Sequence, residues 1–224
     1  MFEEARFIMS KIMSAAEAVS NIREGGVVMV GGFGLRGCPF ALVDALVESG
    51  VGNLTIVSND LGAPGEGLGK LLDNNQIKAL VGNYYNWNRN AIMAYNRGEI
   101  EVTILPQGSF AESIRAAGVG IPAYYTPASA GTDLSKGKDV RWFDGIPHVL
   151  EQAIRADVAL ISAKKADTLG NLVYSKTARN FKPAMAMAAR YTIALVDEIV
   201  EVGQLDPENI ITPHIFVNAI VRGE

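Results

Sequence analysis

The sequence predicts an α/β protein with an open, mainly parallel sheet and helices on both faces. Short apolar runs alternate with segments of helical spacing, and glycine, with 23 of 224 residues, separates many of them. Continuous apolar runs are typical of parallel strands, which are buried on both faces. Strand and helix patterns that alternate predict parallel pairing. We expect a single domain over residues 1–224, with a small irregular or antiparallel insertion around 118–147.

The individual elements follow from the apolar runs and from the turn residues between them. Strands are expected at Val27–Val30, Leu54–Asp60, Ala79–Gly82, Glu101–Leu105, Asp157–Ile161, Asn171–Tyr174 and Thr192–Val196. Helices are expected from Ser14 to about Arg23, from Pro39 to Gly50, after Gly69, from Asn90 to Gly98, from Ser109 to Gly118, over Val149–Arg155 and over Pro183–Arg190. The first and fifth of these helices begin with a capping box, in which Glu17 and Glu112 are the partners of Ser14 and Ser109. Ile215–Val221 closes the chain as a strand or a helix.

A glycine-rich turn joins the first strand to its helix. Gly31, Gly32, Gly34 and Gly37 stand within seven positions. Turns of this kind bind anionic ligands in many α/β proteins. The segment 32–37 also fits the dinucleotide fingerprint, with Asp60 as the acid that this fingerprint requires at the end of the next strand.

Two features of the turn count against a nicotinamide cofactor. Pro39 would remove a hydrogen bond inside the helix that a dinucleotide turn has already begun at that point. A doubled glycine, Gly31-Gly32, is also absent from the fingerprint. An NAD-dependent oxidoreductase therefore stands as the alternative from a different class of enzyme.

Composition excludes several classes of protein. A net charge of -4 argues against a nucleic-acid partner. A single cysteine, Cys38, excludes an intrachain disulfide and a cysteine-rich zinc site. No run approaches the about 20 apolar residues of a transmembrane helix, and the early acids Glu3 and Glu4 do not fit a signal peptide. We expect a cytoplasmic protein without a membrane, metal or nucleic-acid partner.

Few residues suit acid–base or nucleophilic catalysis. His148 and His214 are the only histidines, and each stands beside a proline, so we expect ordinary surface or loop residues. Cys38 is expected to pack under the glycine-rich turn rather than to act as a nucleophile. Five basic residues near the C-terminal half are expected on a solvated face, namely Lys164, Lys165, Lys176, Arg179 and Lys182.

Polar side chains at strand ends are better candidates. Asn59 and Asp60 end the second strand, and Gln107 with Gly108 follows the fourth. Because the carboxyl ends of parallel strands share one edge, we expect these residues to face a common crevice. Amide side chains can orient a carboxylate or donate hydrogen bonds to a developing oxyanion.

The glycine-rich turn, from Gly31 to Pro39, resembles the signature of the A (alpha) chain of family I coenzyme A transferases. The resemblance continues along nearly the whole chain, through Leu54-Thr55, Ser58-Asn59, Leu105–Gly108, Tyr125–Pro127, Lys165–Asp167, Ala178–Phe181 and Ile211–Pro213. The sequence departs from the family pattern at Glu24-Gly25 and Ala128–Ala130. It also departs at the aromatic segment 82–90, where acyl specificity could vary.

The resemblance implies ping-pong transfer of CoA between an acyl-CoA and a carboxylate, through a glutamate of a second chain, the beta subunit. The present chain lacks the Ser-Glu-Asn-Gly motif of that glutamate, so no catalytic nucleophile is expected here. The implied partner is this beta subunit, in a heterodimer, an α2β2 assembly or larger. CoA is a substrate, and no cofactor is expected.

The resemblance also implies substrates and substrate contacts. The favoured substrates are acetyl-CoA or butyryl-CoA with acetoacetate or a similar short acid. The alternative within the family is 3-oxoadipate or succinyl-CoA:3-oxoacid transfer. The implied substrate-binding residues are Gly31, Gly32, Phe33, Gly34, Asn59, Gln107 and Gly108.

Overall fold

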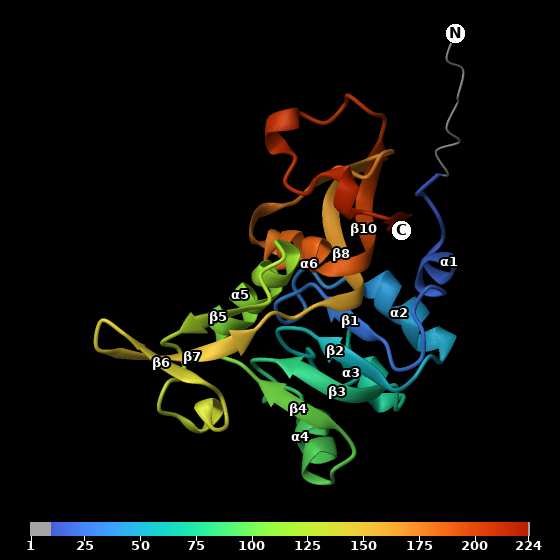
Figure 1. Ribbon diagram of the computed structural model, residues 1–224. Coiled ribbons are helices and arrows are strands. Elements are labelled where there is room, and N and C mark those ends of the chain that lie inside the picture. Colours follow the sequence, from blue (N-terminus) through green and yellow to red (C-terminus); the bar gives the residue numbers. More distant parts are fainter. Residues whose placement is uncertain (1–9, 224) are drawn as a thin grey trace.

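The computed structural model describes residues 10–223, and a large open sheet forms its centre (Figure 1). Its strands follow the order β11-β10-β8-β1-β2-β3-β4, and β9 pairs with β8 beside this path. Every pair along the path is parallel, and β9 alone runs antiparallel to its neighbour. The strands are β1 (Val27–Val30), β2 (Leu54–Val57), β3 (Ile77–Gly82), β4 (Glu101–Ile104), β8 (Ala156–Asp167), β9 (Leu172–Val173), β10 (Ala189–Val200) and β11 (Ala219–Arg222). The predicted open, mainly parallel sheet is confirmed.

Strand β1 lies in the middle of the sheet. Val28 of β1 pairs with Ile56 of β2 on one side and with Val158 of β8 on the other. The chain first builds outward from β1 to β4, and then crosses to β8 and builds outward to β11. The carboxyl end of β1 is therefore the point at which the strand order reverses. Open α/β sheets bind their ligands at such a point, and here the glycine-rich turn occupies it.

Helices cover both faces of the sheet, as predicted. One core joins Val28 and Val30 of β1 to buried residues of α1, α2, α3 and α4. The other core joins Met29 of β1 to buried residues of α5 and α6. Successive side chains of a strand point to opposite faces, so the apolar run of β1 serves both cores. The helices are α1 (Ala15–Val19), α2 (Phe40–Ser49), α3 (Gly69–Asp73), α4 (Arg89–Asn96), α5 (Gln107–Gly118) and α6 (Lys182–Ala188).

The two predicted capping boxes have different outcomes. The Ser14 hydroxyl accepts a hydrogen bond from the Glu17 amide, and the Ser14 amide donates the reciprocal bond to the Glu17 carboxylate. The first box is therefore confirmed, although α1 ends at Val19. The second box is wrong, because α5 already begins at Gln107, directly after Pro106. Glu112 consequently lies within the helix, where it forms an ion pair with Arg115 at 2.6 Å.

A small antiparallel sheet projects from the body of the molecule (Figure 1). It has the order β5-β7-β6, and this confirms the predicted antiparallel insertion. The expected helix at Val149–Arg155 is wrong, because β7 continues to Gln152 and residues 153–155 lie in neither a helix nor a strand. Val149 and Glu151 are buried at alternate positions, and the Glu151 carboxylate is paired with Lys138 at 2.7 Å. The strands are β5 (Ala123–Thr126), β6 (Val140–Phe143) and β7 (Ile146–Gln152).

Within the described part of the chain, the connections contain the 3-10 helices η1 (Asp133–Ser135), η2 (Lys176–Arg179), η3 (Pro207–Asn209) and η4 (His214–Phe216). The C-terminal segment, expected as a strand or a helix, contains both, because η4 precedes β11. The acidic N-terminal residues that argue against a signal peptide lie outside the described residues. Within residues 10–223, no helix is both long and apolar enough to cross a membrane.

Candidate functional site

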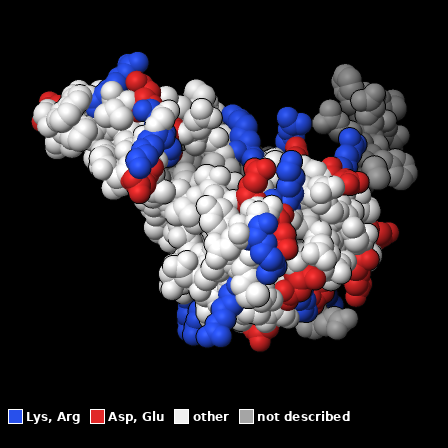
Figure 2. All heavy atoms as spheres, turned by 90° about the horizontal axis from the view of Figure 1, so that it is seen from below, with Lys and Arg blue, Asp and Glu red and all other residues white. Residues whose placement is uncertain are grey.

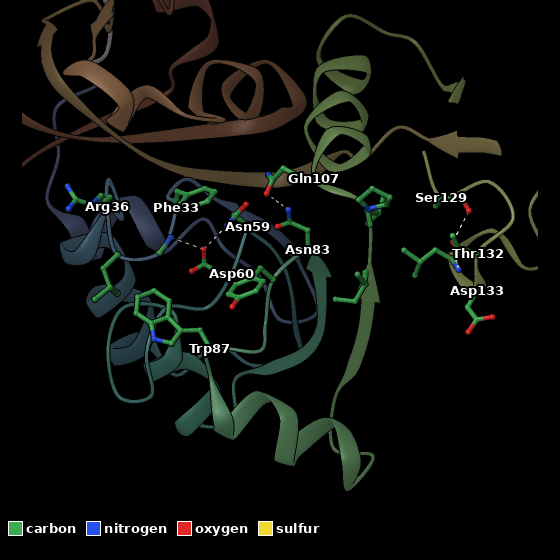
Figure 3. A pocket seen from close by; sticks show the side chains of 17 residues that line it. Phe33, Arg36, Asn59, Asp60, Asn83, Trp87, Gln107, Ser129, Thr132 and Asp133 are labelled. Atoms are coloured by element: carbon green, nitrogen blue, oxygen red, sulfur yellow. Dashed lines mark hydrogen bonds between the residues drawn. The ribbon is translucent and has the colours of Figure 1, made fainter. Parts of the chain in front are cut away.

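A cavity of about 1140 Å³ lies at the carboxyl ends of four strands (Figure 3). The loops after β1, β2, β3 and β4 supply most of its wall, and the segment between β5 and β6 closes one end. Phe33, Asn59, Asn83 and Gln107 represent the four loops, and Leu134 the closing segment. Neighbouring parallel strands end at one edge, so residues far apart in the sequence meet here.

The glycine-rich turn forms one wall of the cavity. Phe33 and Arg36 exchange backbone hydrogen bonds of 3.1 and 3.2 Å, which closes a tight reversal of the chain. Gly34 has a φ of 59° within this reversal. A β carbon on Gly34 would lie 3.0 Å from the Trp87 ring. Gly34 therefore satisfies both the left-handed backbone and the close approach of the indole.

Asp60 ties the glycine-rich turn to the segment 59–62 beneath this wall. Its carboxylate accepts hydrogen bonds from the Gly34 amide at 2.7 Å, the Gly62 amide at 2.8 Å and the Asn59 side chain at 2.7 Å. The side chain is nearly buried, with 6% exposed. Both oxygens are thus engaged by donors of the chain itself. This leaves the acid of the apparent dinucleotide fingerprint with a role in holding the turn.

Two amide side chains face each other at the polar end of the cavity. Asn83 donates to the Oε1 atom of Gln107, and Asn59 lies beside this pair (Figure 3). The Gln107 amide nitrogen therefore remains available as a donor. The Asn59 side-chain amide donates a hydrogen bond to the Asp60 carboxylate. Its Oδ1 atom is buried with no hydrogen-bond partner among residues 10–223. A buried acceptor of this kind gains from a ligand that brings a donor.

The remainder of the wall is apolar and aromatic. Phe33, Tyr84 and Trp87 are 57%, 55% and 49% exposed, so their rings present apolar surface to the cavity. Among the lining residues, charge is limited to Arg36, Asp60 and Asp133. No glutamate belongs to this described lining, and Asp133 is ion-paired with a lysine at 2.7 Å.

The structure brings together four of the seven predicted substrate-binding residues. Phe33, Gly34, Asn59 and Gln107 line the cavity. Gly31 and Gly32 lie behind the wall, where they line a small hollow with Cys38. Gly108 lies in α5 and does not belong to the lining. The role of all seven in substrate binding stays a prediction.

Sequence reasoning named neither Asn83 nor any residue of the closing segment as a substrate contact, although it linked the segment 82–90 to acyl specificity. Asn83 directly follows β3, so the rule that selected Asn59 and Gln107 would have found it as well. Ser129, Thr132 and Leu134 approach the cavity only through the fold of the small sheet. None of these three residues follows a strand directly, although Ser129 belongs to the segment 128–130 that departs from the family pattern.

The remaining candidates for catalysis lie outside the cavity. His148 packs its ring against Phe143 in the small sheet, and the His214 amide binds Asn171. Burial raises the pKa of the Cys38 thiol to about 12, so this cysteine is no nucleophile at neutral pH. Among the described residues, no three metal-binding side chains lie close enough to hold an ion.

The basic residues expected on a solvated face differ in their outcome. Lys164 and Lys165 form half-exposed ion pairs at 2.9 and 2.7 Å, and Lys176 and Arg179 are exposed. The expectation is wrong for Lys182, which is 1% exposed. Figure 2 shows basic and acidic side chains interspersed on one face, with no continuous basic surface.

The comparisons with known proteins agree with one another. A family model described as "Coenzyme A transferase" matches residues 12–223. The alpha subunit of the succinyl-CoA:3-ketoacid coenzyme A transferase of Helicobacter pylori (strain J99) is 46% identical over 217 residues, which cover 96% of this chain and 94% of that protein. The alpha subunit of the 3-oxoadipate CoA-transferase of Acinetobacter baylyi is 49% identical over 207 residues, which cover 92% and 91%.

A solved structure shares the fold. The acyl-CoA transferase of Escherichia coli O157:H7, in a thioester complex with CoA, matches with a TM-score of 0.84 at 20% identity. The match covers 96% of this chain and 47% of the other. This chain thus spans about half the length of the E. coli protein, whose remaining residues have no counterpart here.

Proposed function

The chain belongs to the coenzyme A transferase family, as an alpha subunit, and on this premise we propose that it works in a two-chain enzyme that transfers CoA between succinyl-CoA and a 3-oxo acid. The 3-oxo acid is acetoacetate or 3-oxoadipate. The names of the relatives support this alternative above the acetyl-CoA or butyryl-CoA transfer that the sequence favoured.

One observation carries the proposal of a second chain. The cavity has amide donors and an apolar wall, but the carboxylates that line it are those of Asp60 and Asp133. Asp60 is occupied by three donors, and Asp133 is paired with Lys136. Covalent transfer needs a free carboxylate that attacks the thioester. We assign that carboxylate to a glutamate of the beta subunit, which would enter the open side of the cavity.

The chain's own residues have clear tasks in this scheme. Attack on a thioester places negative charge on its carbonyl oxygen, and Gln107 can donate its free amide hydrogen to such an oxygen. Phe33 and Trp87 exclude water from the acyl group, which protects an activated intermediate from hydrolysis. Asp60 holds the glycine-rich turn and Asn59 in place for these contacts.

Arg36 supports the choice of a dicarboxylic substrate. It is the cation among the residues that line the cavity, and no ion pair of the described residues includes it. In Figure 3, Phe33 lies between Arg36 and Asn59, which places Arg36 at one end of the cavity. The distal carboxylate of a succinyl or 3-oxoadipyl group would find its counter-ion there, since guanidinium groups pair with carboxylates in bidentate geometry.

The proposal is tested by combining the purified chain with a beta subunit of the family. We expect CoA transfer from succinyl-CoA to acetoacetate or 3-oxoadipate only when both chains are present. Hydroxylamine, which reacts with thioesters, should label a glutamate of the beta subunit during turnover. Labelling of this chain instead would overturn the assignment of the nucleophile.

A substrate panel separates the alternatives. Succinyl-CoA and acetyl-CoA are compared as donors, each with acetoacetate, 3-oxoadipate and butyrate as acceptors. Higher kcat/KM with acetyl-CoA and butyrate would return the assignment to short monocarboxylic acids. A titration of NADH fluorescence tests the oxidoreductase alternative, and we expect no saturable binding.

A further inference from the structure

A buried lysine lies behind the glycine-rich turn, on the side that faces β8. Lys182 is the first residue of α6 and is 1% exposed. Its ammonium group donates to the Ser162 hydroxyl at 2.7 Å, and this hydroxyl donates to the Gly37 carbonyl at 2.9 Å. Lys182 takes part in no ion pair among residues 10–223. The reaction proposed above does not involve this charge.

The lysine side chain and the turn fit each other closely. A β carbon on Gly31 would lie 2.6 Å from Cγ of Lys182, and one on Gly37 would lie 2.6 Å from its Nζ atom. Both separations are far below a normal contact. Gly37 also has a φ of 73°, which disfavours other residues. Gly31 is therefore needed to make room for the Lys182 side chain, and Gly37 is needed for its backbone conformation beside Nζ.

The charge of Lys182 sets the direction of the hydrogen bonds. An ammonium group has three donors and no lone pair, so it can only donate to Ser162. The single proton of the Ser162 hydroxyl is then directed to the Gly37 carbonyl. A neutral amine could instead accept that proton, and the bond to Gly37 would be released. A charged donor also strengthens the next bond in such a chain.

We infer that Lys182 is a positioning residue for CoA transfer, because its ammonium group directs Ser162 onto the Gly37 carbonyl and thereby fixes the cavity wall. The inference rests on the proposed function. The Asp60 carboxylate holds the Gly34 amide of the same turn from the cavity side at 2.7 Å. The Asp60 carboxylate thus binds an amide of the turn. The Lys182 ammonium group, through Ser162, binds a carbonyl of the same turn. A wall that shifts by about 1 Å can lower a rate about 100-fold.

The groups around Lys182 make its charge state accessible to experiment. Burial lowers the pKa of Lys182 to about 8. Cys38 and Tyr174, which share its surroundings, have pKa values that burial raises to about 12, so both stay neutral. Lys164 remains charged in its ion pair with Asp197, which raises its pKa. Between pH 7 and pH 9 the ammonium form of Lys182 is lost, and positioning should be lost with it as the pH rises.

The test uses the enzyme assembled from this chain and its beta subunit. The variants are Lys182→Met and Ser162→Ala, and Lys78→Met on the exposed side of β3 is the matched control. We expect kcat of the first two to fall about 10-fold to 100-fold, with a smaller change in KM. The wild-type kcat should decline as the pH rises through about 8. Both variants should lack this decline, and the control should keep it.

A kcat of Lys182→Met within about twofold of the wild type, with the same decline above pH 8, would overturn the inference. If Lys182→Met does not fold, Ser162→Ala tests the inference. Deleting the hydroxyl oxygen removes both the hydrogen bond from Lys182 and the hydrogen bond to Gly37. A second readout needs no activity. In the ¹⁵N-labelled chain within the assembled enzyme, the amide signals of Gly34 and Gly37 should titrate near pH 8 in the wild type and not in the variants.

These two readouts separate the two proposals. An assembled enzyme that transfers no CoA between any donor and acceptor of the panel contradicts the proposed function. The amide titration still tests the hydrogen bonds from Lys182 through Ser162 to Gly37. Signals that do not move between pH 7 and pH 9 contradict the role of Lys182 even in a fully active enzyme.

Discussion

The two sides of the glycine-rich turn differ in exposure and in the sign of the charge that they carry. On the cavity side, the rings of Phe33 and Trp87 are half-exposed, and the nearly buried Asp60 carboxylate accepts a hydrogen bond from the Gly34 amide. On the side of β8, the cation of Lys182 is buried and donates to the Ser162 hydroxyl. The difference separates recognition from support. Side chains on the exposed side can change with the substrate, whereas those on the buried side must keep the backbone in one place.

The largest effect on stability and on kcat is expected from Asp60, which holds the turn from the cavity side. Asp60→Ala removes the acceptor of three donors, so the free energy of unfolding should fall by about 2–4 kcal/mol. The displaced wall should lower kcat at least about 100-fold. Urea unfolding and steady-state kinetics measure the two effects. The control Asp133→Ala removes an exposed carboxylate of the same cavity and should cost under about 0.5 kcal/mol. Wild-type kcat in Asp60→Ala would show that the turn needs no anchor on this side.

A smaller effect is expected from crowding the turn. Gly34→Ala meets both a φ of 59° and the Trp87 ring, 3.0 Å from the new carbon, and should cost about 1–3 kcal/mol. The double variant with Trp87→Ala should recover the part of this cost that arises from the ring. A double-mutant cycle in urea measures the coupling. Strict additivity would mean that the indole moves aside freely and does not form a fixed part of the wall.

A purely functional effect is expected at the polar end of the cavity. Gln107→Ala removes an exposed donor, so kcat should fall about 10-fold to 100-fold while stability changes by under about 0.5 kcal/mol. Asn86→Ala, an exposed amide outside the cavity lining, is the control. An unchanged kcat in the assembled enzyme would remove Gln107 from the site.

The smallest effect is expected at the rim. Arg36→Met should raise KM for succinyl-CoA or 3-oxoadipate about 5-fold to 30-fold, since a charge-assisted hydrogen bond contributes about 1–2 kcal/mol. The KM for acetoacetate, which has no second carboxylate, should stay unchanged. Equal changes for all acids would assign Arg36 to the turn rather than to the substrate.

The elements that the sequence predicted well are those whose signals are local. The apolar run of β1, the proline and glycine at the ends of α2 and the first capping box each act within a few residues, and all are present in the structure. The expectation that residues at the ends of parallel strands face one crevice also holds for Asn59 and Gln107, which line the same cavity.

The errors arose where distant segments override local patterns. The segment 149–155 was predicted as a helix, but pairing with β5 and β6 places residues 149–152 in β7. Ser109 and Glu112 match a capping box, yet Pro106 starts the helix earlier. Lys182 looks like a solvated lysine, and only the glycine at 31, about 150 residues away, provides the space that buries it.

The central position of β1 has a consequence for synthesis of the chain. Val27 and its partner segment at Asp157 are 130 residues apart in sequence. At about 5–20 residues per second, a ribosome needs roughly 7–26 seconds to make the intervening residues. During this interval β1 has β2 on one side and an open apolar edge on the other. Nascent chains that end before residue 156 should therefore bind chaperones, and the demand should end once β8 has emerged.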